Sequence, residues 1–194
     1  MSIERWEIAS RSTIHFTVRH LLISKVRGRF RRWSGTLLVP DGDWSRATVE
    51  VVIDASSIDT GNAKRDTDLR TANFLDVERS PDITFRSLGV TGEQAGRLRV
   101  AGELTMRGRV GEVPLEVEIS SLTLDRSGHE RARFSARAAI RRRDFGASGN
   151  LAWDSYGIMI GERVEIEINV EALSQAAAAI AFSSDIHDVT VSQG

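Results

Sequence analysis

Polar and apolar residues alternate along most of this chain with a period of two, which places successive side chains on opposite faces of a β-strand. The pattern is clearest at residues 131–138 and 163–170, where charged or polar residues alternate with alanine, phenylalanine, valine and isoleucine. Weaker alternation occurs in six further segments: 14–18, 37–39, 49–53, 83–85, 97–106 and 113–119. These amphipathic segments predict an all-β protein of about eight strands.

The connections between the segments favour antiparallel neighbours. Residues 40–43 (PDGD) are typical of a hairpin turn, as are 92–96 and 127–128. A meander of about eight amphipathic strands either stacks as two sheets or closes on itself, and closure removes the exposed edges that promote aggregation. We therefore expect an antiparallel β-barrel in preference to a sandwich.

Three segments interrupt the alternation. Residues 20–24 form a short apolar run that predicts a helical turn, and 62–72 predict a short helical connection. The alternation stops after Leu173. We therefore expect a barrel domain over residues 1–173, followed by a C-terminal tail or short docked helix over 174–194.

The size of the inward side chains decides whether such a barrel is filled or hollow, because an eight-stranded barrel can do either. One face of the seventh segment carries Ala132, Ala136 and Ala138 around a single Phe134, and Gly102 interrupts the apolar row of the fifth. If these faces point inward, they leave a long apolar space that suits a hydrocarbon chain. Alternation alone fits a filled core equally well, so both interiors stay open at this point.

Composition narrows the classes of function. The 194 residues suit one domain, and a net charge of -1 gives no general affinity for nucleic acid. Cysteine is absent, and the four histidines lack the spacing of a zinc site, so we expect neither metal nor cofactor. The basic run at 141–143 fits an ion-paired strand end, and no motif of a known catalytic class occurs.

Location is also predicted from the sequence. No stretch approaches the roughly 20 apolar residues of a membrane helix, so we expect no membrane span. Residues 1–18 leave no room for the apolar core of a signal peptide. The expected location is therefore the cytoplasm, unless a leader was removed.

Several short motifs follow one another in order. They are 12–21 (STIHFTVRHL), 26–30 (VRGRF) with Gly35, 58–60 (IDT), 65–66 with Leu69, 74–76 (FLD), 80–85 (SPDITF), 102–108 (GELTMRG) and 143–146 (RDFG). Together they resemble the YceI-like family of lipocalin-like, polyisoprenoid-binding proteins, from about Trp6 to Leu173. The chain departs from the family pattern at Arg11 and Asp68, where histidine is usual, and at 109–113.

The resemblance implies a lipocalin-like barrel without enzymatic activity that binds and stores or transports a long-chain isoprenoid lipid, such as a polyprenyl quinone or polyprenyl phosphate. It also implies that two barrels pair as a homodimer. The departures leave the head-group preference open. Two other functions remain as alternatives: a small enzyme acting on an apolar substrate, and a stress-response or structural barrel with a filled core.

The resemblance and the strand parity together predict which residues contact the lipid. Those expected to line the tail are Phe16, Val18, His20, Phe30, Phe85, Leu104, Phe134, Ala136, Ala138, Phe145, Val164, Ile166 and Ile168. His20 is also a candidate head-group contact, with a cap on the neighbouring turn as the alternative. Arg65 and Asp66 are candidates for a gate or head-group contact, although such a pair more often anchors a loop. His15 has the opposite parity and is expected to be exposed.

Overall fold

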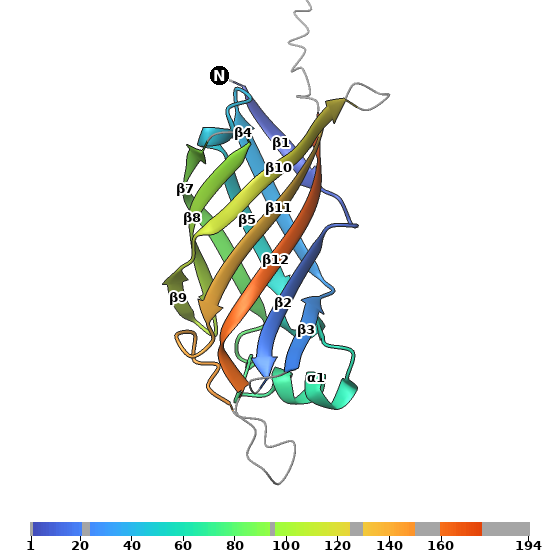
Figure 1. The fold of residues 1–194 in the computed structure, drawn as a ribbon, viewed down its shortest axis with the longest axis vertical. Helices are drawn as coiled ribbons and strands as arrows, with labels where there is room; N and C mark the ends of the chain where they lie inside the picture. Colours follow the sequence, from blue (N-terminus) through green and yellow to red (C-terminus); the bar gives the residue numbers. More distant parts are fainter. Residues whose placement is uncertain (1, 21–23, 94–95, 125–129, 150–159, 176–194) are drawn as a thin grey trace, which may run out of the picture.

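The computed structural model describes residues 2–20, 24–93, 96–124, 130–149 and 160–175. This part of the chain is mostly β-structure, with one short helix at the lower end of the molecule (Figure 1). The strands are β1 (Ile3–Ile8), β2 (Thr13–His20), β3 (Ser24–Phe30), β4 (Trp33–Pro40), β5 (Thr48–Asp54), β6 (Ile58–Asp59), β7 (Asp82–Glu93), β8 (Arg97–Met106), β9 (Arg109–Glu112), β10 (Leu115–Leu124), β11 (Glu130–Arg141) and β12 (Ile160–Gln175). The helix is α1 (Ala63–Arg70), and the 3₁₀ turns are η1 (Trp44–Arg46) and η2 (Ala55–Ser57).

The strands close into an eight-stranded antiparallel barrel. Both β1 and β2 pair with β12, so they are two halves of one broken strand, and the pairs β3 with β4 and β5 with β6 are related in the same way. From these three composite strands the wall continues through β7, β8, β10 and β11 to β12, which closes the ring. Each of the eight segments predicted from alternation lies in a different strand of this ring. The predicted barrel and its meander order are confirmed.

The breaks in the composite strands β1/β2 and β3/β4 form backbone hydrogen bonds with different neighbours. Between β1 and β2, the amide of Ala9 donates to the carbonyl of Glu171 at 2.7 Å, and the amide of Ser12 donates to the carbonyl of Ala9. Between β3 and β4, the amide of Arg31 donates to the carbonyl of Ser57 at 3.1 Å. The first break is therefore held on β12 and the second on η2.

Aromatic side chains close the upper end of the barrel, which is the end that carries β1 and η1 in Figure 1. Trp6, 1% exposed, packs against Trp44, and Trp44 packs against Phe134, both with ring centroids 5.2 Å apart. Small or buried neighbours surround them, among them Ala132 and Ala172. We call Trp6, Trp44 and Phe134 the upper aromatic cluster.

Helix α1 covers the lower end. The side chain of Asn62 caps it by accepting a hydrogen bond from the amide of Arg65 at 3.0 Å, as favoured at a helix N-terminus. The predicted helical connection at 62–72 is therefore confirmed. The described helices include none long and apolar enough to cross a membrane.

The remaining local predictions have mixed outcomes. Asp41 and Gly42 both adopt positive φ, 51° and 71°, which fits the turn predicted at 40–43. The helical turn at 20–24, the turns at 92–96 and 127–128, and most of the tail lie wholly or partly outside the described residues. β12 continues to Gln175, two residues beyond the predicted domain boundary, and the tail after it stays a prediction.

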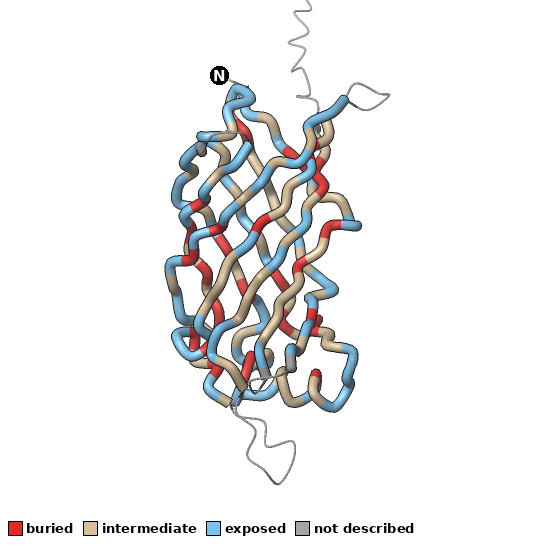
Figure 2. The backbone as a smooth tube through the Cα atoms, viewed as in Figure 1, coloured by how far each residue is buried: buried red, intermediate tan, exposed pale blue. Residues whose placement is uncertain are grey.

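Burial alternates along the strands (Figure 2). The inner side chains near the middle of the wall, such as Phe16, Val51 and Ile168, are only partly buried although they pack against the core. A side chain inside a closed barrel keeps accessible surface only when it faces an internal space. The interior is therefore hollow.

Candidate functional site

An elongated cavity of about 300 Å³ lies inside the barrel, and the surface that it meets is apolar. At the upper end it stops at Trp44 and Phe134. At the lower end it reaches Leu69 of α1 and Phe74 in the following loop. The cavity therefore follows the barrel axis between the upper aromatic cluster and α1, which is the shape that a single extended hydrocarbon chain requires.

Strand parity and aromatic packing create this space. Phe16 and Phe30 lie side by side on neighbouring strands, with ring centroids 5.7 Å apart. The ring of Phe16 also covers Gly28, where a Cβ atom would lie only 2.2 Å from it. Gly28 therefore lets a large ring lie flat against the wall and not across the barrel axis.

Gly102 does not have the consequence expected from the sequence. The prediction that it leaves free volume is wrong, because the ring of Phe85 occupies the space beside it, and a Cβ atom there would lie 2.2 Å from that ring. Glycine here accommodates an aromatic neighbour. The free volume instead lies along the axis, where Ala136 and other inner residues border it.

The structure brings most of the predicted lining residues together. Those that border the cavity are Phe16, Val18, Phe30, Phe85, Leu104, Phe134, Ala136, Val164, Ile166 and Ile168. Ala138 packs against the core but does not border the cavity, and Phe145 is buried with its ring against Gly111. His20 lies in β2 opposite Ile160, and its side chain is outside the described residues. Lipid contact by any of these residues stays a prediction.

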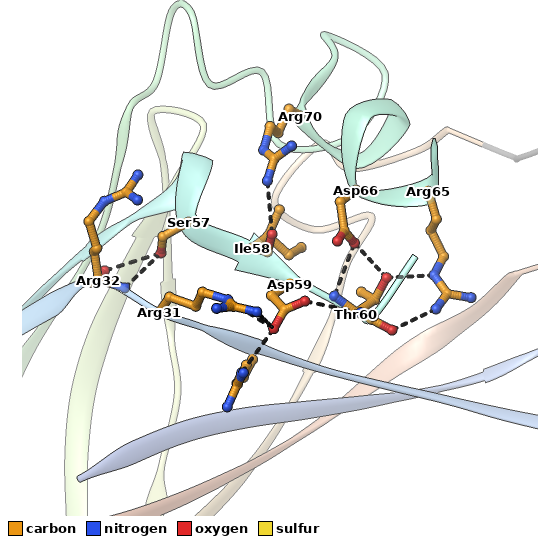
Figure 3. Close-up of polar contacts among 11 residues, drawn as sticks. Arg31, Arg32, Ser57, Ile58, Asp59, Thr60, Arg65, Asp66 and Arg70 are labelled. Atoms are coloured by element: carbon orange, nitrogen blue, oxygen red, sulfur yellow. Dashed lines mark hydrogen bonds and ion pairs between the residues drawn. The ribbon is translucent and has the colours of Figure 1, made fainter. Parts of the chain in front are cut away.

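Arg65 and Asp66 converge on Thr60 and not on the cavity (Figure 3). Asp66 is buried and accepts hydrogen bonds from the amide and the hydroxyl group of Thr60. The Arg65 guanidinium donates to the hydroxyl and carbonyl oxygens of Thr60 at 2.7 and 2.9 Å. Arg70 donates to the carbonyl groups of Ser56 and Ile58. This geometry fits the loop-anchor alternative, because it fixes α1 beneath the barrel.

Arg142 lies at the lower end of the cavity, a position that the alternation pattern did not predict. It is 5% exposed, and its guanidinium donates to the carbonyl groups of Gly161, Ala147, Gly149 and Ile160. Burial lowers its pKa below the usual arginine value, and nearby positive charge adds to the effect. Arg142 joins the start of β12 to the loop after β11. Alternation gave no signal for this role, because the acceptors are backbone carbonyl groups, two in the loop after β11 and two at the start of β12, and the period of a strand reports only on side chains.

His15 differs in part from its prediction. In the backbone register it stands opposite Arg29 and Glu167, yet it is partly buried and is one of the residues around the cavity. Its Nδ1 atom has no hydrogen-bond partner among the described residues. Burial lowers the pKa of His15 below its ordinary value; Arg27 and Arg29 lower it further, while Glu167 raises it. No group of three or more histidine and acidic side chains in the described part of the chain is placed to hold a metal ion.

Glu171 fixes the break between β1 and β2 from the outer side. This carboxylate is buried and forms ion pairs with Arg11 at 2.7 Å, with Arg131 and with Arg133. Its backbone also exchanges hydrogen bonds with the Ser12 hydroxyl group. One buried acid therefore holds the break against β11 and β12.

Comparison with known proteins agrees with this architecture. Residues 6–172 match the YceI-like domain family. Protein YceI of Salmonella newport is 34% identical over 162 residues, which is 84% of this chain and 81% of that protein. The crystal structure of a Campylobacter jejuni YCEI protein has a TM-score of 0.68 at 26% identity and covers 81% of this chain and 90% of that one.

A more distant solved structure shares the fold alone. It is described as a polyisoprenoid binding domain from Saccharophagus degradans implicated in plant cell wall breakdown. It has a TM-score of 0.63 at 16% identity and covers 88% of this chain and 98% of that one. The family match spans nearly the whole barrel, from Trp6 in β1 to Ala172 in β12. The chain belongs to the YceI-like domain family.

Proposed function

We propose that this protein binds a long-chain isoprenoid lipid inside its barrel and stores or carries it without chemical change. The observation that carries the proposal is the apolar cavity along the axis, between the upper aromatic cluster and α1. The solved polyisoprenoid binding domain with the same fold supports an isoprenoid tail. A prenyl quinone and a polyprenyl phosphate are the two ligand classes that we propose to test.

Apolar contact is sufficient for useful affinity. Each buried methylene group contributes about 0.8 kcal/mol, so about ten of them give roughly 8 kcal/mol before the entropic cost of association is subtracted. A dissociation constant in the micromolar range corresponds to about the same free energy. No specific polar contact inside the cavity is needed, which suits a carrier that must also release its lipid.

Neither alternative function draws support from the described residues. A barrel filled by its own side chains does not fit a cavity of about 300 Å³. An enzyme acting on a bound lipid requires a nucleophile or an acid–base pair beside it. The polar residues around the cavity within the described part of the chain are His15, Thr48 and Arg142; Thr48 follows η1 at the upper end, and Arg142 lies at the lower end. They do not form one polar cluster. Cytoplasmic location and pairing of two barrels stay predictions.

The test is extraction of the purified protein with organic solvent, followed by mass spectrometry of the extract. Protein stripped of lipid is then incubated with prenyl quinones and polyprenyl phosphates of known chain length. We expect a stoichiometric isoprenoid in the extract or saturable uptake afterwards. Absence of both would refute the proposal.

A further inference from the structure

A second concave region lies on the outside of the barrel wall. It is a groove of about 1070 Å³ between the composite strand β1/β2 and the composite strand β3/β4. The break residues Ala9 to Ser12 form one side, and Arg31 and Ser34 lie on the other. We call this region the wall groove. The structure describes all the residues that line it.

Backbone pairing is interrupted along the wall groove. Above it, β1 pairs with β4 as far as Glu7 and Thr36; below it, β2 pairs with β3 from Ile14 and Phe30. No pairing joins the described residues 8–13 to residues 31–35. The backbone hydrogen bonds of the two breaks point away from each other, one from Ala9 toward β12 and the other from Arg31 toward η2. Separating the two strands at the groove therefore breaks fewer backbone hydrogen bonds than it would at a paired part of the wall.

The wall groove and the internal cavity share part of their lining. Ile8, Ile14, Phe30 and Trp33 border both. Ile8 lies against Gly35, where a Cβ atom would be 2.6 Å from the Ile8 Cδ1 atom. Here only apolar side chains separate the wall groove from the internal cavity. Side chains change rotamer more readily than two hydrogen-bonded strands separate.

The rim of the wall groove is polar and rich in donors. Arg5, Arg11, Arg29 and Arg31 line it together with Glu7 and Glu50. Arg11 pairs with Glu171, and Arg29 and Arg31 pair with Asp59, but each guanidinium has five N–H donors and these bonds use only some of them. Such a rim suits the acceptor oxygens of a lipid head group, whether they belong to a phosphate or to a quinone.

The upper end of the cavity is a less suitable route. The upper aromatic cluster blocks the axis there, and Trp6 is almost completely buried within it. Movement of a chain past Trp6, Trp44 and Phe134 would separate two ring contacts. Passage through the wall groove displaces four apolar side chains that already face the cavity.

From these observations we infer that the wall groove is the entrance of the barrel: the lipid tail passes between Ile8, Ile14, Phe30 and Trp33 into the cavity, and the acceptor end of the lipid stays in the groove. This inference rests on the proposed function. It places the head group beside β1 and β4, at a distance from α1.

The chain contains no cysteine, so the entrance can be closed by designed disulfides without competing thiols. Glu7 and Thr36 are direct partners at the upper margin, and His15 and Arg29 are direct partners at the lower margin. Antiparallel partners have Cα atoms roughly 4.5 to 5.5 Å apart, within the range that a disulfide spans. The test variant carries cysteine at these four positions; the control carries Glu116→Cys and Arg137→Cys, which are partners on the far wall between β10 and β11.

Uptake of a polyprenyl phosphate and of a prenyl quinone is measured by stopped-flow fluorescence with each variant oxidised and reduced. We expect oxidation to slow uptake at least tenfold in the test variant and to leave the control unchanged. Equal uptake rates in the oxidised and reduced test variant would refute the inference that the wall groove is the entrance. Absence of uptake by the unmodified protein would instead refute the proposed function.

A second measurement locates the head group and does not depend on forming disulfides. A fluorophore is attached to Ser34→Cys in the wall groove or to Thr67→Cys on α1; both positions are exposed. A lipid of either class carries a nitroxide quencher on its head. Stronger quenching at position 34 than at 67 is expected for both classes. The reverse order would place the entrance at the lower end and overturn the inference.

Discussion

A larger side chain at position 136 tests lipid binding separately from folding, because it would fill part of the cavity. Ala136 is 9% exposed and lies on the inner face of β11, where it borders the cavity. Its partners on the two neighbouring strands, Val117 and Ile168, border the same space. Ala136→Trp would therefore place an indole ring in the path of a bound tail.

The expected loss of affinity follows from the displaced contacts. If the ring takes the place of about four methylene groups of the ligand, binding weakens by roughly 3 kcal/mol, which is about a hundredfold in the dissociation constant. Adding bulk to a filled core usually costs about 1 to 3 kcal/mol of stability. Because the ring enters a cavity and does not displace packed side chains, we expect a cost near the lower value.

Ala139→Trp is the matched control. Ala139 lies on the same strand but has the opposite parity, and it pairs with Glu165. Lipid affinity is measured by titration with a fluorescent prenyl lipid, and stability by urea unfolding of the lipid-free proteins. We expect a large loss of affinity for Ala136→Trp alone. Unchanged affinity in a folded Ala136→Trp protein would refute the assignment of the cavity as the tail site.

Three further predictions concern the wall of the barrel. Gly102→Ala should destabilise the protein by about 2 kcal/mol because its methyl group meets the ring of Phe85, whereas Gly89→Ala, with open space around it, should change the urea midpoint little. The folded-state pKa of His15 is lowered, so the unfolded chain binds this proton more readily; the free energy of unfolding should fall as the pH drops below about 6.5, and a similar fall in His15→Gln would contradict the reasoning. Glu171→Ala leaves three arginines without their shared carboxylate and should cost about 3 kcal/mol in thermal or urea unfolding; a loss below about 1 kcal/mol would show that solvent replaces the carboxylate.

The sequence identified one part of each barrel strand but not the complete strands. Alternation predicted the inner positions of β11 and β12, such as Phe134 and Ile166, because the two faces of those strands are chemically distinct over 131–138 and 163–170. It missed β3, where Gly28 stands in the inner row, because a glycine carries no hydrophobic signal. Only the folded protein shows that the ring of Phe16 supplies the apolar surface at that position.

The lower end shows the same limit. Arg65 and Asp66 were recognisable as a charged pair, but their common partner, Thr60, follows from how α1 turns back toward β6. Arg142 was treated as part of a basic strand end. Its guanidinium binds the carbonyl groups of Ala147 and Gly149 in the following loop and those of Ile160 and Gly161 in β12, and the second pair comes within reach only when β12 pairs with β11.

The sequence by itself determined that amphipathic strands form an antiparallel barrel, because the period of two is a local property of each strand. The tertiary structure decided that the barrel is hollow and that its wall is interrupted between β1/β2 and β3/β4. An enclosed volume depends on how side chains from strands far apart in the sequence fit together, and a missing backbone pair depends on two breaks meeting across the wall. Neither property is written in the period of a single strand.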